Sequence, residues 1–122
     1  MTKRTRSQNG KRSRLRGQAF EREIADWFKA RGFPDARRNL QAQGGVIVGN
    51  DLKGVPWAIE CKRNDHCLFP KGVKAWKQCD EDARAIKDPS PRMVIHRWNE
   101  QKEPFVLLTL SDLERIIEQA SE

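Results

Sequence analysis

The sequence has no long apolar run. No segment approaches the roughly 18 residues that a membrane-spanning helix needs, and no apolar stretch follows the basic N-terminus as it would in a secretion signal. Cysteine is also scarce. Three cysteines, an odd number, in a chain without secretory features are more typical of reduced thiols than of a disulfide framework. We therefore expect a cytoplasmic protein with no membrane partner.

Zinc-ligand spacings are missing as well. Cys61, His66, Cys67 and Cys79 form neither a C-x-x-C nor an H-x-x-x-H pattern. Isolated thiols are ordinary buried residues, so a zinc site is the weaker interpretation of this group.

The first 16 residues contain no acidic side chain. Seven of the chain's 24 lysines and arginines lie there, so the rest of the chain is formally neutral, with 17 basic and 17 acidic residues. Because residues 1–16 also lack apolar periodicity, we expect a flexible basic arm ahead of a single domain at 17–122. Such an arm fits DNA or another polyanion, although a merely solubilising terminus has the same composition. The seven basic residues are Lys3, Arg4, Arg6, Lys11, Arg12, Arg14 and Arg16.

The spacing of apolar residues predicts one α/β domain. Phe20, Ile24, Trp27 and Phe28 recur at helical spacing, which predicts a helix over residues 18–31 that packs on a core. The other elements are expected, in chain order, as strands over 36–41, 46–48 and 55–62, a helix over 70–87, strands over 93–98 and 104–110, and a final helix opened by a capping box of Ser111 and Glu114.

Two turns, at 44–45 and 52–54, would join the first three strands into a small antiparallel meander. The apolar residues of the two later helices are expected to face the core. They are Val73, Trp76, Ala83 and Ile86 in the helix at 70–87, and Leu113, Ile116, Ile117 and Ala120 in the final helix.

The strand expected at residues 55–62 carries the residues that suggest chemistry. Side chains alternate along a strand, so Glu60 and Lys62 share one face while Cys61 points to the other. If Asp51 ends the preceding strand of a hairpin, its carboxylate lies beside that of Glu60. Two carboxylates suit Mg²⁺ or Mn²⁺, which would polarise a phosphodiester and activate water, with Lys62 stabilising the developing charge. The alternative is a solvated salt bridge between Glu60 and Lys62.

The same segment resembles the core motif of the PD-(D/E)XK nuclease superfamily. The resemblance lies in Asp51, a short turn with Gly54, and the apolar pair at 58–59 ahead of Glu60-Cys61-Lys62. Members of the superfamily have an α-β-β-β-α-β core with a mixed sheet flanked by helices. The order of elements expected here agrees with that core and adds one strand and a C-terminal helix.

Within the superfamily the chain looks most similar to archaeal-type Holliday junction resolvases, including phage-encoded relatives. Their first helix opens with a Gly and, four residues later, a Glu followed by Arg, and here Gly17 precedes Glu21-Arg22. The resemblance implies a metal-dependent endonuclease that acts as a homodimer and resolves four-way DNA junctions by paired nicks. Flaps, nicks or plain duplex are the alternative substrates, and a non-enzymatic basic DNA-binding protein is the alternative class.

The resemblance also implies roles for individual residues. Asp51, Glu60 and the backbone carbonyl of Cys61 would bind Mg²⁺, for which Mn²⁺ can substitute, and Lys62 would be the catalytic lysine. Glu21 would join the acidic cluster through a metal-bound water; the alternative is a surface pair with a neighbouring base.

Three further positions are weaker candidates. Gln78 matches a position where relatives often carry a polar active-site residue, and a solvated helix glutamine is the alternative. Arg38 and Arg63 are expected to contact DNA together with the basic arm.

Overall fold

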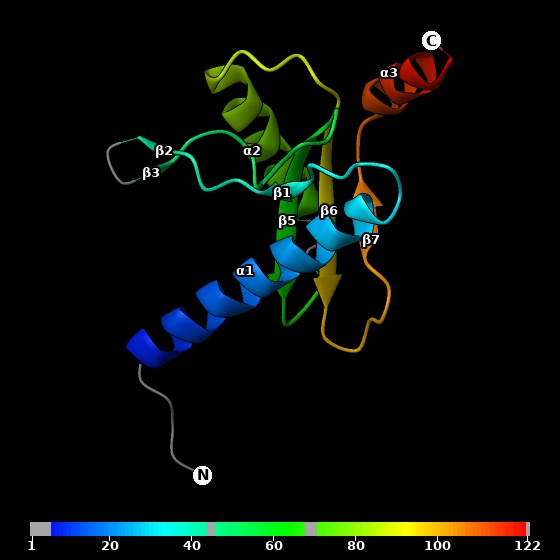
Figure 1. Ribbon diagram of the computed structural model, residues 1–122. Coiled ribbons are helices and arrows are strands. Elements are labelled where there is room, and N and C mark those ends of the chain that lie inside the picture. Colours follow the sequence, from blue (N-terminus) through cyan, green and yellow to red (C-terminus); the bar gives the residue numbers. More distant parts are fainter. Residues whose placement is uncertain (1–5, 44–45, 68–70, 122) are drawn as a thin grey trace.

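A mixed three-stranded sheet lies at the centre of the computed structural model, which describes residues 6–43, 46–67 and 71–121 (Figure 1). Its strands are β5 (Ala58–Asn64), β6 (Arg92–Trp98) and β7 (Phe105–Leu107), in that order. Strands β5 and β6 are parallel and are joined through helix α2 (Gly72–Ala85), whereas β7 is antiparallel to β6. The expected mixed sheet flanked by helices is therefore confirmed as a small α+β fold.

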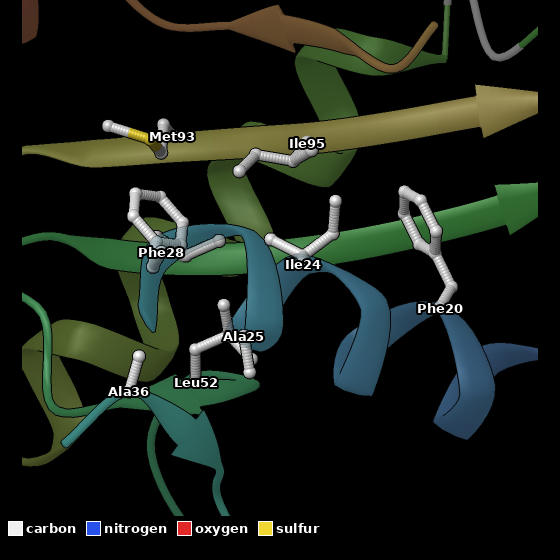
Figure 2. Close-up of a cluster of buried hydrophobic side chains, with 9 residues drawn as sticks. Phe20, Ile24, Ala25, Phe28, Ala36, Leu52, Met93 and Ile95 are labelled. Carbon is white, nitrogen blue, oxygen red and sulfur yellow. The ribbon is translucent and has the colours of Figure 1, made fainter. Parts of the chain in front are cut away.

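Helix α1 (Arg6–Lys29) crosses one face of this sheet and α2 covers the other (Figure 1). Side chains alternate along β5 and β6, so each face of the sheet has its own set of apolar residues. Figure 2 shows the larger cluster, in which Phe20, Ile24 and Phe28 of α1 meet Met93 and Ile95 of β6. On the opposite face, a smaller cluster joins β5 to α2; it consists of Ala58, Cys79 and Ala83.

Four very short strands lie beside the sheet. Strand β1 (Arg37–Arg38) pairs antiparallel with β4 (Leu52–Lys53), and β2 (Ala42–Gln43) pairs with β3 (Val46–Ile47). The expected three-stranded meander is therefore wrong. Residues expected to form a turn are β4 instead, and β5 pairs with the distant β6. The expected turn at 44–45 lies outside the described residues.

The turn between β4 and β5 depends on Gly54. Its φ is +83°, and a Cβ placed there would lie 2.1 Å from the backbone oxygen of Asp35. Only glycine fits such a close approach without moving the chain. This turn returns the chain from the β1–β4 pair to the start of β5, and so it helps to place the segment that contains Asp51.

Helix α1 begins at Arg6, much earlier than the expected start at residue 18. The expected boundary at residue 16 thus falls inside a helix, and the prediction of an irregular arm is wrong from Arg6 onward. Arginine, lysine, glutamine and leucine are good helix formers and no proline interrupts them, so the segment can continue the helix without an apolar stripe, although Ser7, Asn9 and Gly10 are poorer helix formers. Lys3 and Arg4 lie outside the described residues.

Helix α2 confirms the expected second helix, and Ala83 is buried and Trp76 partly buried as expected, but the rest of its buried face differs from the expected one. Val73 and Ile86 are about half exposed, while Ala75 and Cys79 are buried. The helix presents small side chains to the sheet, which allows close approach, and the larger apolar residues lie at its margins. The expected starting position, Pro70, lies outside the described residues.

Helix α3 (Leu110–Ala120) is capped by Thr109 and Asp112, and the predicted box of Ser111 and Glu114 is wrong. Asp112 accepts hydrogen bonds from the backbone of Arg92 (3.0 Å) and from the indole of Trp76 (2.9 Å), so the cap also ties α3 to α2 and β6. Several apolar residues of α3 that were expected to face the core are exposed. They include Leu113 and Ile117. Within the described ranges, none of the helices is long and apolar enough to cross a membrane.

Candidate active site

Asp51 lies along the free edge of β5, on the side away from β6. Its backbone N–H donates to the carbonyl oxygen of Ile59 (3.0 Å), and its carboxylate accepts a hydrogen bond from the backbone N–H of Cys61 (2.7 Å). The expected position of Asp51 beside the strand is therefore correct, although it precedes β4 rather than ending a hairpin strand.

Asn39 and Asn50, both buried, hold the segment around Asp51 in place. The side-chain amide of Asn39 donates to the backbone carbonyl oxygens of Val48 (2.6 Å) and Asn50 (2.7 Å). The backbone N–H of Asn39 donates to the backbone carbonyl oxygen of Asp51 (2.8 Å). Asn50 in turn donates to the carbonyl oxygen of Cys79 on α2 (3.0 Å). These hydrogen bonds fix the loop against both β1 and α2, so they act as positioning contacts for the acidic residue.

Glu60 and Lys62 share the face of β5 that is turned toward α2, as the strand period predicts. The Lys62 ammonium lies 3.3 Å from a carboxylate oxygen of Glu60. The Glu60 residue is only 7% exposed. The salt bridge of the alternative interpretation is therefore present, but its two halves differ, because Glu60 is buried while Lys62 remains partly exposed.

Burial makes the two carboxyl groups hard to ionise. Burial, then the nearby Glu60, raise the pKa of Asp51 to about 8, against a smaller opposing effect of the hydrogen bond from Cys61. Burial also raises the pKa of Glu60, although the adjacent Lys62 ammonium works against it. Desolvation and the proximity of a second acid both favour the neutral form, and both effects are reversed when a cation is present. A cation bound beside the two carboxyl groups would therefore favour their ionised forms.

The backbone of Cys61 lies at the same strand edge as Asp51. In an extended strand the N–H and C=O of one residue project to the same side, so the Cys61 carbonyl also points to the Asp51 edge. Its thiol packs against the core cluster on the α1 face, and burial raises its pKa well above the usual range. The thiol is therefore a packing group, while the carbonyl is the atom available to the site.

Glu21 reaches the region from α1, but it forms an ion pair with Arg38 (2.8 Å), and both side chains are largely buried. Both residues line a surface cavity of about 520 Å³ with Asp51 and Arg14. Glu21 thus lies near the acids, as expected, with an arginine as its partner rather than the neighbouring bases of its own helix.

The other predicted residues lie farther out. Gln78 is exposed on α2 and donates to Asp82 (2.9 Å), whose charge helps to raise the pKa of Glu60. Arg63 lies on the α1 face, where its guanidinium donates to Asn99 (2.9 Å), and it is crowded by two other arginines. Arg16 forms an ion pair with Asp65, which joins the N-terminal half of α1 to the end of β5. Lys11, Arg12 and Arg14 are exposed on α1.

A divalent cation fits the chemistry of the Asp51–Glu60 pair. Two buried carboxylates with raised pKa values and a strand-edge carbonyl are oxygen donors of the kind Mg²⁺ and Mn²⁺ prefer. Among the residues that the structure describes, no group of three His, Cys, Asp or Glu side chains is gathered closely enough to hold a metal by itself. The protein would thus supply few of the ligands, which leaves the remaining positions to water or to a substrate phosphate.

No family model matches this chain, and no match is found among curated proteins or among solved structures. The geometry of the site therefore carries the functional argument.

Sequence reasoning missed two parts of the site. The Asn39–Asn50 scaffold was not found, because a buried asparagine in an irregular segment has no periodic signal; two asparagines on either side of a glycine-rich turn were the only hint. The pair of Arg38 with Glu21 was also missed, since each was assigned a separate role and their contact depends on the docking of β1 against α1.

Proposed function

We propose that this protein is a Mg²⁺-dependent DNA endonuclease with a PD-(D/E)XK-type core, and that its preferred substrate is the four-way DNA junction. The observation that carries the proposal is the buried Asp51–Glu60 pair with Lys62 at its side. Titratable groups with strongly perturbed pKa values cluster at functional sites, and two buried acids beside an ammonium at a strand edge have this character.

Each residue has a role that its position supports. Asp51 and Glu60, with the Cys61 carbonyl, would hold Mg²⁺, which supplies a Lewis acid for phosphodiester hydrolysis when bound. Lys62, which is partly exposed, would orient the attacking water or stabilise the charge that develops on the phosphate. Arg38 and Arg14 line the adjoining cavity and would position DNA phosphates there.

The order of elements supports the same proposal. A first helix, short strands around an aspartate, the strand with Glu60 and Lys62, a crossover helix and a parallel strand follow one another here. The last part of that succession, a strand, a crossover helix and a parallel strand, supports the resemblance to the superfamily core, whereas short paired strands replace the three-stranded meander before it.

Resolution of a junction needs two nicks related by symmetry, so we propose that the protein acts as a homodimer. Helix α3 and β7 expose an apolar face that a second copy would bury. Its residues are Val106, Leu110, Leu113 and Ile117. As a DNA enzyme without a membrane partner, it would work in the cytoplasm.

The decisive experiment compares labelled four-way junction, flap and linear duplex in one assay with Mg²⁺. We expect the junction to be bound in excess unlabelled duplex without metal, and to be nicked with Mg²⁺ on two opposed strands of like polarity, giving ends that a ligase can seal. Residues 17–122 carry no formal net charge, so they attract plain duplex only weakly at long range. Selectivity for a junction then has to come from the shape of the branch.

Other outcomes of this assay would favour a general endonuclease or a non-enzymatic DNA-binding protein. Cleavage of flap or duplex as fast as junction, or nicks on one strand only, would leave a general endonuclease with the same site residues. Tight binding of DNA with no cleavage in Mg²⁺ or Mn²⁺ would point to a non-enzymatic DNA-binding protein.

The basic residues of α1 provide a separate prediction. Replacing the exposed Lys11, Arg12 and Arg14 by glutamine should reduce the slope of log K against log salt by up to about 2.7, because each phosphate contact contributes roughly 0.9. The loss should be similar for all DNA sequences, since phosphate contacts carry no base information.

The matched control replaces by glutamine three exposed lysines that do not line the cavity beside Asp51. These are Lys29, Lys87 and Lys102. An equal loss of slope in this control, or no loss in the α1 variant, would show that the N-terminal half of α1 is a solubilising segment and not a DNA contact.

A further inference from the structure

Three aromatic rings stack against one another on the face of the sheet that carries Glu60 and Lys62. The His96 and Trp98 rings are 5.2 Å apart at 23°, and the Trp98 and Phe105 rings are 5.1 Å apart at 22°. Near-parallel rings at these spacings are stacked face to face with an offset, so they form a short column, which we call the aromatic platform; the uncovered ring surface at its end is where a further ring could stack.

The register of the sheet places the platform directly beside Lys62. Lys62 lies opposite His96 on β6, and His96 lies opposite Phe105 on β7, so the three side chains form one row across three strands. Trp98 lies in the next row, opposite Asn64. Neighbouring strands are about 4.8 Å apart, so the platform begins about 5 Å and ends about 10 Å from the strand that carries Lys62.

The platform lies beyond the N-terminal end of α2 and is partly open to solvent. A Cβ on Gly72, the first residue of α2, would lie 2.8 Å from the side chain of Leu107, which is one row closer to the start of β5 than Phe105. The helix therefore covers the row with Glu60 and stops before the row with Lys62. Phe105 is 48% exposed, and His96 and Trp98 are partly exposed.

The platform differs from the core aromatic contacts. Phe28 meets Phe33 at 78° and Trp57 at 42°, whereas the Trp98 ring lies within 23° of parallel to both His96 and Phe105, next to the Lys62 cation. Aromatic faces beside a phosphate-binding cation are the combination that proteins use to hold unpaired bases.

We propose that the aromatic platform of His96, Trp98 and Phe105 binds an unpaired base of the DNA next to the cleaved phosphodiester. The inference rests on the proposed nuclease function, because it is the phosphate at Lys62 that makes a nucleobase the ligand. A stacked strand rises about 3.4 Å per nucleotide along its axis, so the base in question lies one to three nucleotides from the cleaved bond. The substrate would be DNA that offers an unstacked base there, as a branch point does and an intact duplex does not.

The test measures stacking separately from charge and without cleavage. In metal-free buffer, affinity is measured for a thymidine 12-mer and for a 12-mer of the same length whose sugars carry no bases. The two strands have the same phosphates, so a difference between them reports the bases. We expect the wild-type protein to bind the thymidine strand about 5- to 100-fold more tightly, from the usual worth of base–aromatic stacking.

Substitutions then locate the effect. Trp98→Leu should remove most of the difference between the two strands, and Trp98→Phe should largely keep it, because phenylalanine still offers a ring face. Phe105→Leu provides a second test at a more exposed position, where loss of the fold is less of a concern. Trp27→Leu is the matched control, since Trp27 is 50% exposed, on α1, and packs against Phe28 rather than near Lys62. Thermal unfolding of each variant shows that it is folded.

The outcomes separate this inference from the nuclease proposal. Equal binding of the two strands by the wild type, or a difference that survives both Trp98→Leu and Phe105→Leu, overturns the platform even if the protein cleaves junctions. An equal loss in Trp27→Leu overturns it too, because the effect would then be general. If the difference depends on Trp98 but no branched DNA is cleaved with Mg²⁺, the platform stands as a surface for unpaired bases and the nuclease proposal fails.

Discussion

Replacing Glu60 by glutamine is expected to lower the rate of the proposed DNA cleavage by about 10³-fold or more, because the loss of the proposed metal ligand would remove several kcal/mol of transition-state stabilisation. Glutamine keeps the size of the side chain and one acceptor oxygen but loses the charge that would hold a divalent cation. DNA affinity should remain unchanged or rise, since an acid facing phosphate repels it. Single-turnover cleavage and metal-free binding of the same junction measure the two effects.

Glu81→Gln is the matched control for this variant. Glu81 lies on the exposed side of α2, so its replacement changes the net charge equally without touching the site. A wild-type cleavage rate in Glu60→Gln would show that Glu60 is not a catalytic residue. Equal losses in both variants would indicate an effect of charge on DNA binding, which the affinity measurement would then also detect.

The arrangement of Glu60 and Lys62 could be predicted from the sequence because a strand has a fixed period of two. Once residues 58–62 are a strand, these two side chains must share a face, and the observed register with β6 and the 3.3 Å contact agree. The burial of Glu60 could not be predicted in the same way. It depends on α2, which a separate stretch of the sequence places over that face.

Longer-range pairings are where the predictions failed. Strand β5 pairs with β6, more than 30 residues away, whereas the sequence suggested pairing with its neighbours. The two-residue strands β1 and β4 carry no periodic signal, because two residues cannot show alternation. The position of Asp51 was nevertheless predicted correctly, since a short turn after it limits how far it can lie from the strand that contains Glu60.

The helices show a different limit of the sequence. Apolar spacing located all three, but it did not determine how much of each apolar face is covered. Leu113 and Ile117 have the spacing of core residues and are 42% and 58% exposed. Helical periodicity reports an apolar face, and only the tertiary arrangement decides whether the same chain or another molecule covers it.

Without metal, the protein is expected to lose stability as the pH rises from about 4 to about 8. Asp51 has a pKa raised from 3.8 to about 8 in the folded chain, so the folded state binds its proton more tightly than the unfolded state does. Unfolding then releases a proton throughout this window, and a higher pH favours unfolding by up to about 1.4 kcal/mol per pH unit for one group. Glu60, whose pKa is also raised, adds to the effect in the same direction.

Asp51→Asn tests the origin of this pH dependence. The variant cannot ionise at position 51, so its stability should fall less across the window and should exceed that of the wild type at pH 8. Asp26→Asn is the control, because the Asp26 side chain is 73% exposed. Thermal or urea unfolding between pH 4 and pH 9 gives the comparison. A wild-type stability that rises toward pH 8 in the absence of metal, or a slope that Asp51→Asn leaves unchanged, would contradict the assignment.

Adding Mg²⁺ should reverse the trend in the wild type alone. A cation at the site binds the ionised carboxylates and stabilises the folded state by about 2.7 kcal/mol when its concentration is 100 times the dissociation constant. The gain should be largest near pH 8, because at lower pH the cation must displace the protons of Asp51 and Glu60. In Asp51→Asn the gain should largely disappear at every pH. Equal stabilisation of both proteins would place the bound Mg²⁺ elsewhere on the chain, and Asp51 would then be a buried acid without a role as a metal ligand.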